Sequence, residues 1–166
     1  QFNRNDPDSF VAEQFVENTA IASGRPVLVV PYAGQFDEVG THVLIAWDGS
    51  REATRALHDA LPFLSRAKRV TVLTINALAG EPPENRIPGV DIAAVISRYG
   101  ANVVTEEVEG VKDEPIGEML LSRAADLSVD LIVMGCYGHS RWRELALGGA
   151  TRSMLKSMTV PVLMSH

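Results

Sequence analysis

The amino-acid sequence predicts an α/β protein built on a doubly wound, five-stranded parallel sheet. Short apolar runs alternate along the chain with segments whose apolar residues recur at the helical period of about 3.6 residues. The runs lack polar alternation, as expected of strands that are buried on both faces. Strands that alternate with helices form parallel sheets with right-handed crossovers, and ligands of such sheets bind at the carboxyl ends of the strands.

The N-terminal part of the chain is predicted to form one helix, one strand and a linker. The helix is capped near Asp8, carries Phe15 in a weak apolar stripe and ends at Gly24. A short strand over residues 27–30 follows. Residues 31–41 are rich in proline and glycine, which predicts a linker with turn chemistry.

The remainder of the chain is predicted to contain five strands joined by helices. The strands are expected at 43–46, 70–75, 102–108, 131–134 and 160–164. Ser50 is placed to cap a helix whose apolar face continues to Leu64. Further helices are expected over residues 92–99, which end at Tyr99, after Pro115 and from Gly149. Proline is common at the first position of a helix, which supports a helix start at Pro115.

Composition excludes several classes of protein. The 166 residues support one full domain and a remnant of another, and the net charge of −6 argues against a general nucleic-acid or membrane surface. No apolar run approaches the roughly 20 residues that span a bilayer. A single cysteine, Cys136, excludes an internal disulfide and suits the reducing cytoplasm. The chain begins at Gln1 without an initiator methionine or signal-peptide character, so we expect a processed or proteolysed piece.

The most informative motif is the spacing Gly135-x2-Gly138-x9-Gly148, which begins where the predicted strand 131–134 ends. Glycines at such a point let the backbone approach a bulky anion, and the N-terminus of the following helix favours a phosphate. The spacing is not the dinucleotide fingerprint, and no lysine follows as in a P-loop. Asp48 and Gly49 also follow a strand end, so they converge with Gly135 if the first and fourth of the five strands are neighbours.

The sequence also contains an internal echo. The run Pro26-Val27-Leu28-Val29-Val30 resembles Pro161-Val162-Leu163-Met164-Ser165, at an offset of 161 − 26 = 135 residues. Each run follows a helical segment. Two similar buried strands explain the echo, and so does a tandem array that is cut inside its first repeat.

Three segments carry a resemblance to a known family: Val43–Ser50 (VLIAWDGS), Asp130–Gly135 (DLIVMG) and Val160–Leu163 (VPVL). With the glycine spacing, residues 40–166 resemble a universal stress protein domain over its whole length. The resemblance implies a Rossmann-like sheet of order 3-2-1-4-5 and a complete domain over 37–166. It implies that residues 1–36 are the last helix and strand of a preceding domain of the same family. It also implies pairing through the last strand, in a homodimer or between tandem domains.

The resemblance further implies an adenine-nucleotide site, for ATP or AMP with or without Mg²⁺. By their positions in the family pattern, Asp48 contacts the adenosine end and Ile75 meets adenine, while the three glycines of the motif face the phosphates. The expected set is completed by His139, Arg141, Gly149, Ala150 and Thr151. Arg141 offers a planar fork of donors to a phosphate. Gly149 departs from the family, whose nucleotide-binding branch has Ser or Thr there and so gains a hydroxyl donor.

Each of these residues also has a purely structural explanation, and three functions therefore remain open. Asp48-Gly49-Ser50 is ordinary turn chemistry, Ile75 is an ordinary strand residue, and the glycines suit tight turns. The leading hypothesis is a nucleotide-binding regulatory domain of a cytoplasmic stress-response protein. The alternatives are an interaction module with a vestigial loop and a weak ATPase in which Asp48 holds Mg²⁺ through water. No nucleophile-base arrangement is visible, so we lean against an enzyme, and we assign no metal role to Cys136 or the histidines.

Overall fold

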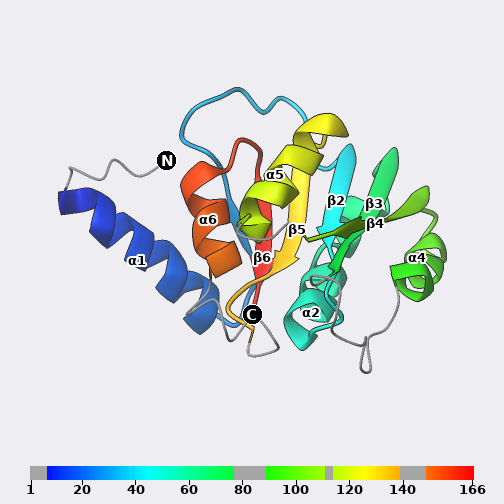
Figure 1. Ribbon diagram of the computed structural model, residues 1–166, viewed down its shortest axis with the longest axis horizontal. Coiled ribbons are helices and arrows are strands. Elements are labelled where there is room, and N and C mark those ends of the chain that lie inside the picture. The colour runs from blue at the N-terminus through cyan, green and yellow to red at the C-terminus, as the bar shows by residue number, and fades with distance from the viewer. Residues whose placement is uncertain (1–6, 77–88, 111–113, 139–148) are drawn as a thin grey trace.

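The computed structural model describes residues 7–76, 89–110, 114–138 and 149–166, which form one sheet covered by helices on both faces (Figure 1). The helices are α1 (Pro7–Ala22), α2 (Arg51–Asp59), α3 (Leu61–Leu64), α4 (Gly89–Ser97), α5 (Ile116–Asp126) and α6 (Gly149–Ser157). The strands are β1 (Val27–Val29), β2 (His42–Ala46), β3 (Arg69–Asn76), β4 (Val103–Glu109), β5 (Leu131–Gly135) and β6 (Val162–Ser165).

The sheet has six strands in the order β1-β6-β5-β2-β3-β4. The strands from β2 to β6 are parallel, and β2 lies in their middle with β3 and β4 on one side and β5 and β6 on the other. A sheet of five parallel strands is nevertheless wrong as a description of the whole, because β1 adds a sixth strand that is antiparallel to β6. The doubly wound α/β class is confirmed.

The central strands are buried on both faces, which explains their apolar runs. In β2, Val43 and Ile45 belong to the core that α2, α3 and α4 cover, whereas Leu44 belongs to the core that α1, α5 and α6 cover. Successive side chains of a strand point to opposite faces, so a strand between two helical layers needs apolar residues at every position. The helices α2, α4, α5 and α6 each follow a parallel strand, so their N-terminal ends lie at the carboxyl edge of the sheet.

One predicted helix is interrupted. The expected helix from Ser50 to Leu64 is two helices, α2 and α3, with Ala60 between them. Pro62 causes the break, since it lacks an N–H group and its ring clashes with the carbonyl of the residue four positions earlier in a continuous helix. Tyr99 lies beyond the end of α4 and is half exposed.

The start of β2 is held by a single carboxylate. The side chain of Asp130, which directly precedes β5, accepts the backbone N–H groups of Gly40, Thr41 and His42 at 2.9, 3.0 and 3.1 Å. Hydrogen bonds to an ionised carboxylate are stronger than those between neutral groups. Asp130 thus holds the amino ends of β2 and β5 beside each other. Because the two strands are parallel neighbours, their carboxyl ends also lie side by side.

The segment α1–β1 lies at the β6 edge of the sheet, where α1 is the outermost helix (Figure 1). Val16 and Ala20 of α1 pack into the core shared with α5 and α6. The predicted stripe was wrong about Phe15, whose exposed fraction is 68%. Its neighbour Val16 is partly buried against the core instead, so the face of α1 toward the sheet is rotated by about one residue from the predicted one.

The pairing of β1 with β6 is symmetric about the echoed residues. Leu28 pairs with Leu163, and each is the third residue of its Pro-Val-Leu run. Val27 pairs with Met164 and Val29 with Val162, so each pair exchanges equivalent positions of the two runs. A local two-fold axis therefore passes between Leu28 and Leu163. Antiparallel pairing of like segments is the geometry of a two-fold interface.

The helices beside these strands follow the same symmetry. Arg152 of α6 stands 152 − 17 = 135 residues after Glu17 of α1, which is the offset of the echo. The two side chains form an ion pair, with 2.9 Å between Arg152 Nε and Glu17 Oε1. β1 thus corresponds to β6 in sequence and pairing, and one ion pair joins equivalent positions of α1 and α6.

No helix in the described ranges has the length and apolarity needed to cross a membrane.

Candidate functional site at the carboxyl edge of the sheet

The two strand ends that the sequence singled out lie side by side. β2 and β5 are parallel neighbours, and Ala46 of β2 is in register with Met134 of β5. Asp48 and Gly49 come just after the first of these residues, and Gly135 just after the second. The expectation that they converge is confirmed, because it depended on these two strands being adjacent.

The turn after β2 is organised by two side chains. Asp48 Oδ1 accepts the backbone N–H of Ser50 at 2.9 Å, and Ser50 Oγ accepts that of Ala53 at 3.1 Å. The second bond is an N-cap, which satisfies a donor that the first turn of a helix leaves unpaired. Asp48 therefore stabilises the turn after β2, a structural role that requires no ligand. It does so at the edge of the sheet where a doubly wound fold binds its ligands.

Gly135 is required by the close packing of α2 against β5. A Cβ atom at this position would lie 2.6 Å from the backbone nitrogen of Ala53 and 2.6 Å from the carbonyl carbon of Glu52. Real Cβ atoms do not approach backbone atoms that closely, so any side chain here would force α2 away from the sheet. Packing alone thus explains Gly135, without a phosphate.

Gly138 makes room for the side chain of Glu52. A Cβ atom at Gly138 would lie 2.9 Å from Glu52 Oε2 and 3.2 Å from Glu52 Cδ. Glu52 is 5% exposed, so its carboxylate is buried between the start of α2 and the turn that follows β5. Glu52 was not predicted as a site residue, although an acidic residue in the first turn of a helix is a common feature that can be recognised in a sequence.

The two residues between these glycines are inward-facing. Cys136 is 1% exposed, and its Sγ donates to the Ser165 carbonyl at 3.4 Å. Burial, together with the negative charge of Glu52, raises the pKa of the Cys136 thiol to about 12. Tyr137 has a φ of 54°, the left-handed conformation that is uncommon outside glycine, and burial followed by the charge of Glu17 raises its pKa. This turn is tightly built, and α1 contributes to its surroundings through Glu17.

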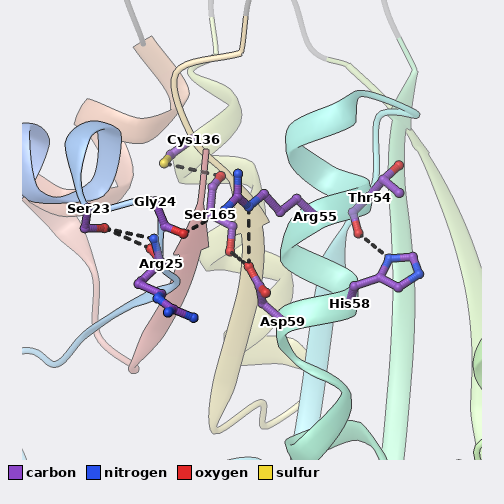
Figure 2. Close-up of polar contacts among 9 residues, drawn as sticks. All are labelled: Ser23, Gly24, Arg25, Thr54, Arg55, His58, Asp59, Cys136 and Ser165. Carbon is purple, nitrogen blue, oxygen red and sulfur yellow. Dashed lines mark hydrogen bonds and ion pairs between the residues drawn. The ribbon is translucent and has the colours of Figure 1, made fainter.

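Beside the turn, a chain of polar contacts joins three parts of the molecule (Figure 2). Ser165 Oγ donates to Asp59 Oδ2 at 2.8 Å, and Asp59 Oδ2 lies 3.9 Å from Arg55 Nε. Arg55 Nη2 in turn donates to the carbonyl of Gly24 at 2.7 Å. The contacts link the end of β6 through α2 to the turn between α1 and β1, as the dashed lines of Figure 2 show. The N-terminal segment is thus held at the same edge as the glycine turn.

Among the described residues, nothing packs closely against the start of α6 at Gly149. Gly149 has no described atom within 4 Å of the position its Cβ would take, so a side chain there is sterically permitted. Ala150 is half-buried and Thr151 is 4% exposed, which turns the Thr151 side chain toward the core. The donors that this helix start offers are therefore its main-chain N–H groups, which lack partners within the helix.

The remaining predicted residues are divided between the end of β3 and undescribed parts of the chain. Ile75 is 9% exposed and lies in the core on the α5 and α6 side. Its neighbour Thr74 has a buried hydroxyl with no hydrogen-bond partner in the described parts of the chain. His139, Arg141 and Gly148 lie outside the described residues. Within the described ranges, no three His, Cys, Asp or Glu side chains are grouped to hold a metal ion.

Comparison with known proteins gives a family for most of the chain. Residues 41–166 match the universal stress protein family. A universal stress protein of Synechocystis sp. is 29% identical over 143 residues, which cover 84% of this chain and 46% of that protein. The chain therefore spans about half the length of the curated relative it matches.

Solved structures share the fold. The crystal structure of a universal stress protein from Archaeoglobus fulgidus has a TM-score of 0.68 at 20% identity, and the match covers 93% of this chain and 53% of that one. An Arabidopsis thaliana protein of the universal stress protein family, solved with AMP bound, has a TM-score of 0.52 at 15% identity. That match covers 75% of this chain and 90% of the other.

Proposed function

Because this chain belongs to the universal stress protein family, we propose that residues 37–166 form a regulatory domain that binds an adenine nucleotide. The ligand is ATP or AMP, and its site is the carboxyl edge of the sheet. Asp48 and Ile75 would meet the adenosine end. The turn Gly135–Gly138 and the start of α6 would meet the phosphates, together with His139, Arg141 and Gly148.

One observation carries this proposal: three elements that can serve a nucleotide meet at a single edge. The end of β2, the end of β5 and the N-terminus of α6 come from distant parts of the sequence, and the parallel pairing of β2 with β5 brings the first two together. A helix N-terminus favours a phosphate through its free N–H groups and its dipole. The Arabidopsis relative with bound AMP supports an adenine ligand for this fold.

Some of the residues at this edge suit a phosphate, and others do not. The start of α6 is open at Gly149 and offers main-chain donors, which suits a phosphate. The inner side of the Gly135–Gly138 turn is already filled by α2, and the family's Ser or Thr hydroxyl is missing at Gly149. These features favour a ligand with few phosphates. If ATP binds, Mg²⁺ would bind to its phosphate oxygens and neutralise part of their charge.

The test is a calorimetric titration of AMP, and of ATP with Mg²⁺, into the parent chain and two variants. Gly149→Glu places a carboxylate at the start of α6 without a described steric conflict, so it should abolish binding while the fold persists. Ser122→Glu adds the same charge on the exposed side of α5 and should leave binding unchanged. Absence of binding by the folded parent, or equal binding by Gly149→Glu, would contradict the proposal.

We also propose that residues 1–36 are the end of a preceding domain of the same family. The support is the two-fold pairing of β1 with β6, the correspondence of Glu17 with Arg152, and the relatives of about twice this length. The β6 edge would then pair with a tandem domain, or with a second chain in a homodimer. A cytoplasmic stress-response role belongs to the same proposal and rests on family membership and the single free cysteine.

A second candidate function is an interaction module that binds no nucleotide. It is favoured by the finding that packing against the backbone of α2 alone explains Gly135. The titration separates the two candidates, since the interaction module predicts no heat with any nucleotide. It also predicts the same oligomeric state by light scattering with and without AMP.

A further inference from the structure

A buried negative charge lies at the proposed phosphate side of the site. Among the charged side chains of the described residues, only that of Glu52 is almost fully buried, with 5% of the residue exposed. Carboxylates are seldom buried unless they are paired or hydrogen-bonded, because the charged form loses its hydration. The position of Glu52 therefore calls for an explanation beyond general surface charge.

Glu52 occupies the space that Gly138 leaves open. Its Oε2 atom is 2.9 Å from the place where a Cβ of residue 138 would be. A glycine at a phosphate-binding turn is useful because the anion can come close where a side chain would stand. Here the carboxylate of Glu52 lies directly beside that place, and a phosphate that approaches from the same side meets a like charge.

The charge of Glu52 is only weakly compensated by its ion-pair partner. The Nη2 atom of Arg51 lies 3.3 Å from Glu52 Oε1, but 88% of the Arg51 side chain is exposed. Ion pairs with an exposed partner are weakened by solvent and salt. The charge also affects the end of β5: burial is the main cause of the raised pKa of Cys136, and the charge of Glu52 adds to it. Glu52 thus acts electrostatically on the glycine turn.

We propose that Glu52 is a specificity-determining residue, which selects adenine ligands with few phosphate charges, adenosine or AMP, over ATP. This inference rests on the proposed nucleotide site and narrows its ligand. A glycine instead of Ser or Thr at position 149 agrees with it independently, because that change removes a phosphate donor from the other side of the site. An acidic residue in the first turn of α2 also interacts favourably with the helix dipole, a role that is compatible with specificity.

The test measures Kd for adenosine, AMP, ADP and ATP in buffer without divalent cations. It uses the parent, Glu52→Gln and the control Glu38→Gln. Glutamine keeps the shape of Glu52 and removes its charge, while Glu38 is an exposed carboxylate that precedes β2 and accepts the Thr41 hydroxyl. Thermal unfolding of each variant establishes that it is folded.

We expect the parent to bind ATP at least tenfold more weakly than AMP. Glu52→Gln should strengthen ATP binding by about tenfold or more and adenosine binding by less than about twofold, since a unit charge several ångströms away acts mainly on the phosphates. Glu38→Gln should match the parent. If the parent and Glu52→Gln bind the four ligands with the same order of affinities, the inference is overturned and the proposed function stands. Binding of no ligand by either protein would overturn both.

Discussion

Replacing Gly135 by alanine tests the geometry on which the site is built. The added methyl would lie 2.6 Å from two backbone atoms of α2, and ordinary contact begins near 3.4 Å, so α2 must move away from β5 by most of an ångström. Both contacts are with main chain, which cannot swing aside as a side-chain end can. Overpacking of this kind costs typically about 1–3 kcal/mol, and we place Gly135→Ala at the upper end, about 3 kcal/mol. For a chain of this size that corresponds to a fall in Tm of about 6–12 °C.

Gly149→Ala is the matched control, because no described atom lies within 4 Å of its added Cβ. Alanine is favoured over glycine in a helix by up to about 1 kcal/mol, so this variant should be as stable as the parent or slightly more stable. Both variants are measured by thermal and urea unfolding followed by far-UV circular dichroism. A Gly135→Ala protein with the Tm of the parent would refute the close approach of α2 to β5.

Three further predictions concern Asp130, Cys136 and the ion pair between Arg152 and Glu17. Asp130→Asn should cost about 1–3 kcal/mol in urea unfolding, because an amide donor then faces the N–H of Thr41 where a carboxylate oxygen accepted it. Cys136 should resist thiol reagents at pH 8 until the chain unfolds. Because the pKa of Cys136 is raised in the folded state, ionisation of this thiol lowers the free energy of unfolding as the pH rises from about 9 toward 12. Below about pH 9 the contribution of Cys136 to stability is fully present, and Cys136→Ala should not show this pH-dependent loss. Arg152→Glu should speed amide hydrogen exchange in β1 about two- to fivefold, as expected for a partly exposed ion pair of about 0.5–1 kcal/mol, and Glu17→Arg in the same chain should restore it.

The parallel part of the fold could be predicted because its strands and helices have different apolar periods. The runs at β2, β3, β5 and β6 were placed within about two residues of their observed bounds, since strands buried on both faces are mostly apolar and lack polar alternation. The antiparallel pairing of β1 could not be derived in this way. A strand of three residues carries no mark of its direction, and the direction is decided by long-range contact with β6.

The candidate site was predictable in its location and only partly in its contents. Asp48 and Gly135 could be placed together because they follow strands whose adjacency the family resemblance implied. The sequence did not indicate that Gly135 and Gly138 face α2 and Glu52. The relation between a helix start and a turn that lies 135 − 52 = 83 residues later depends on packing. Glu17 was missed for the same reason, because its contact with Arg152 crosses the β1–β6 junction.

The measurement that tests the central claim most directly is a titration of AMP into the isotope-labelled chain, followed by backbone amide NMR. We expect saturable chemical-shift changes at three places on one edge of the sheet: Asp48–Ser50, Gly135–Gly138 and Gly149–Thr151. The amides of Gly40, Thr41 and His42, which Asp130 binds at the opposite edge, should not shift. No saturable shift, or shifts that gather around Asp130 instead, would contradict a nucleotide site at the carboxyl edge.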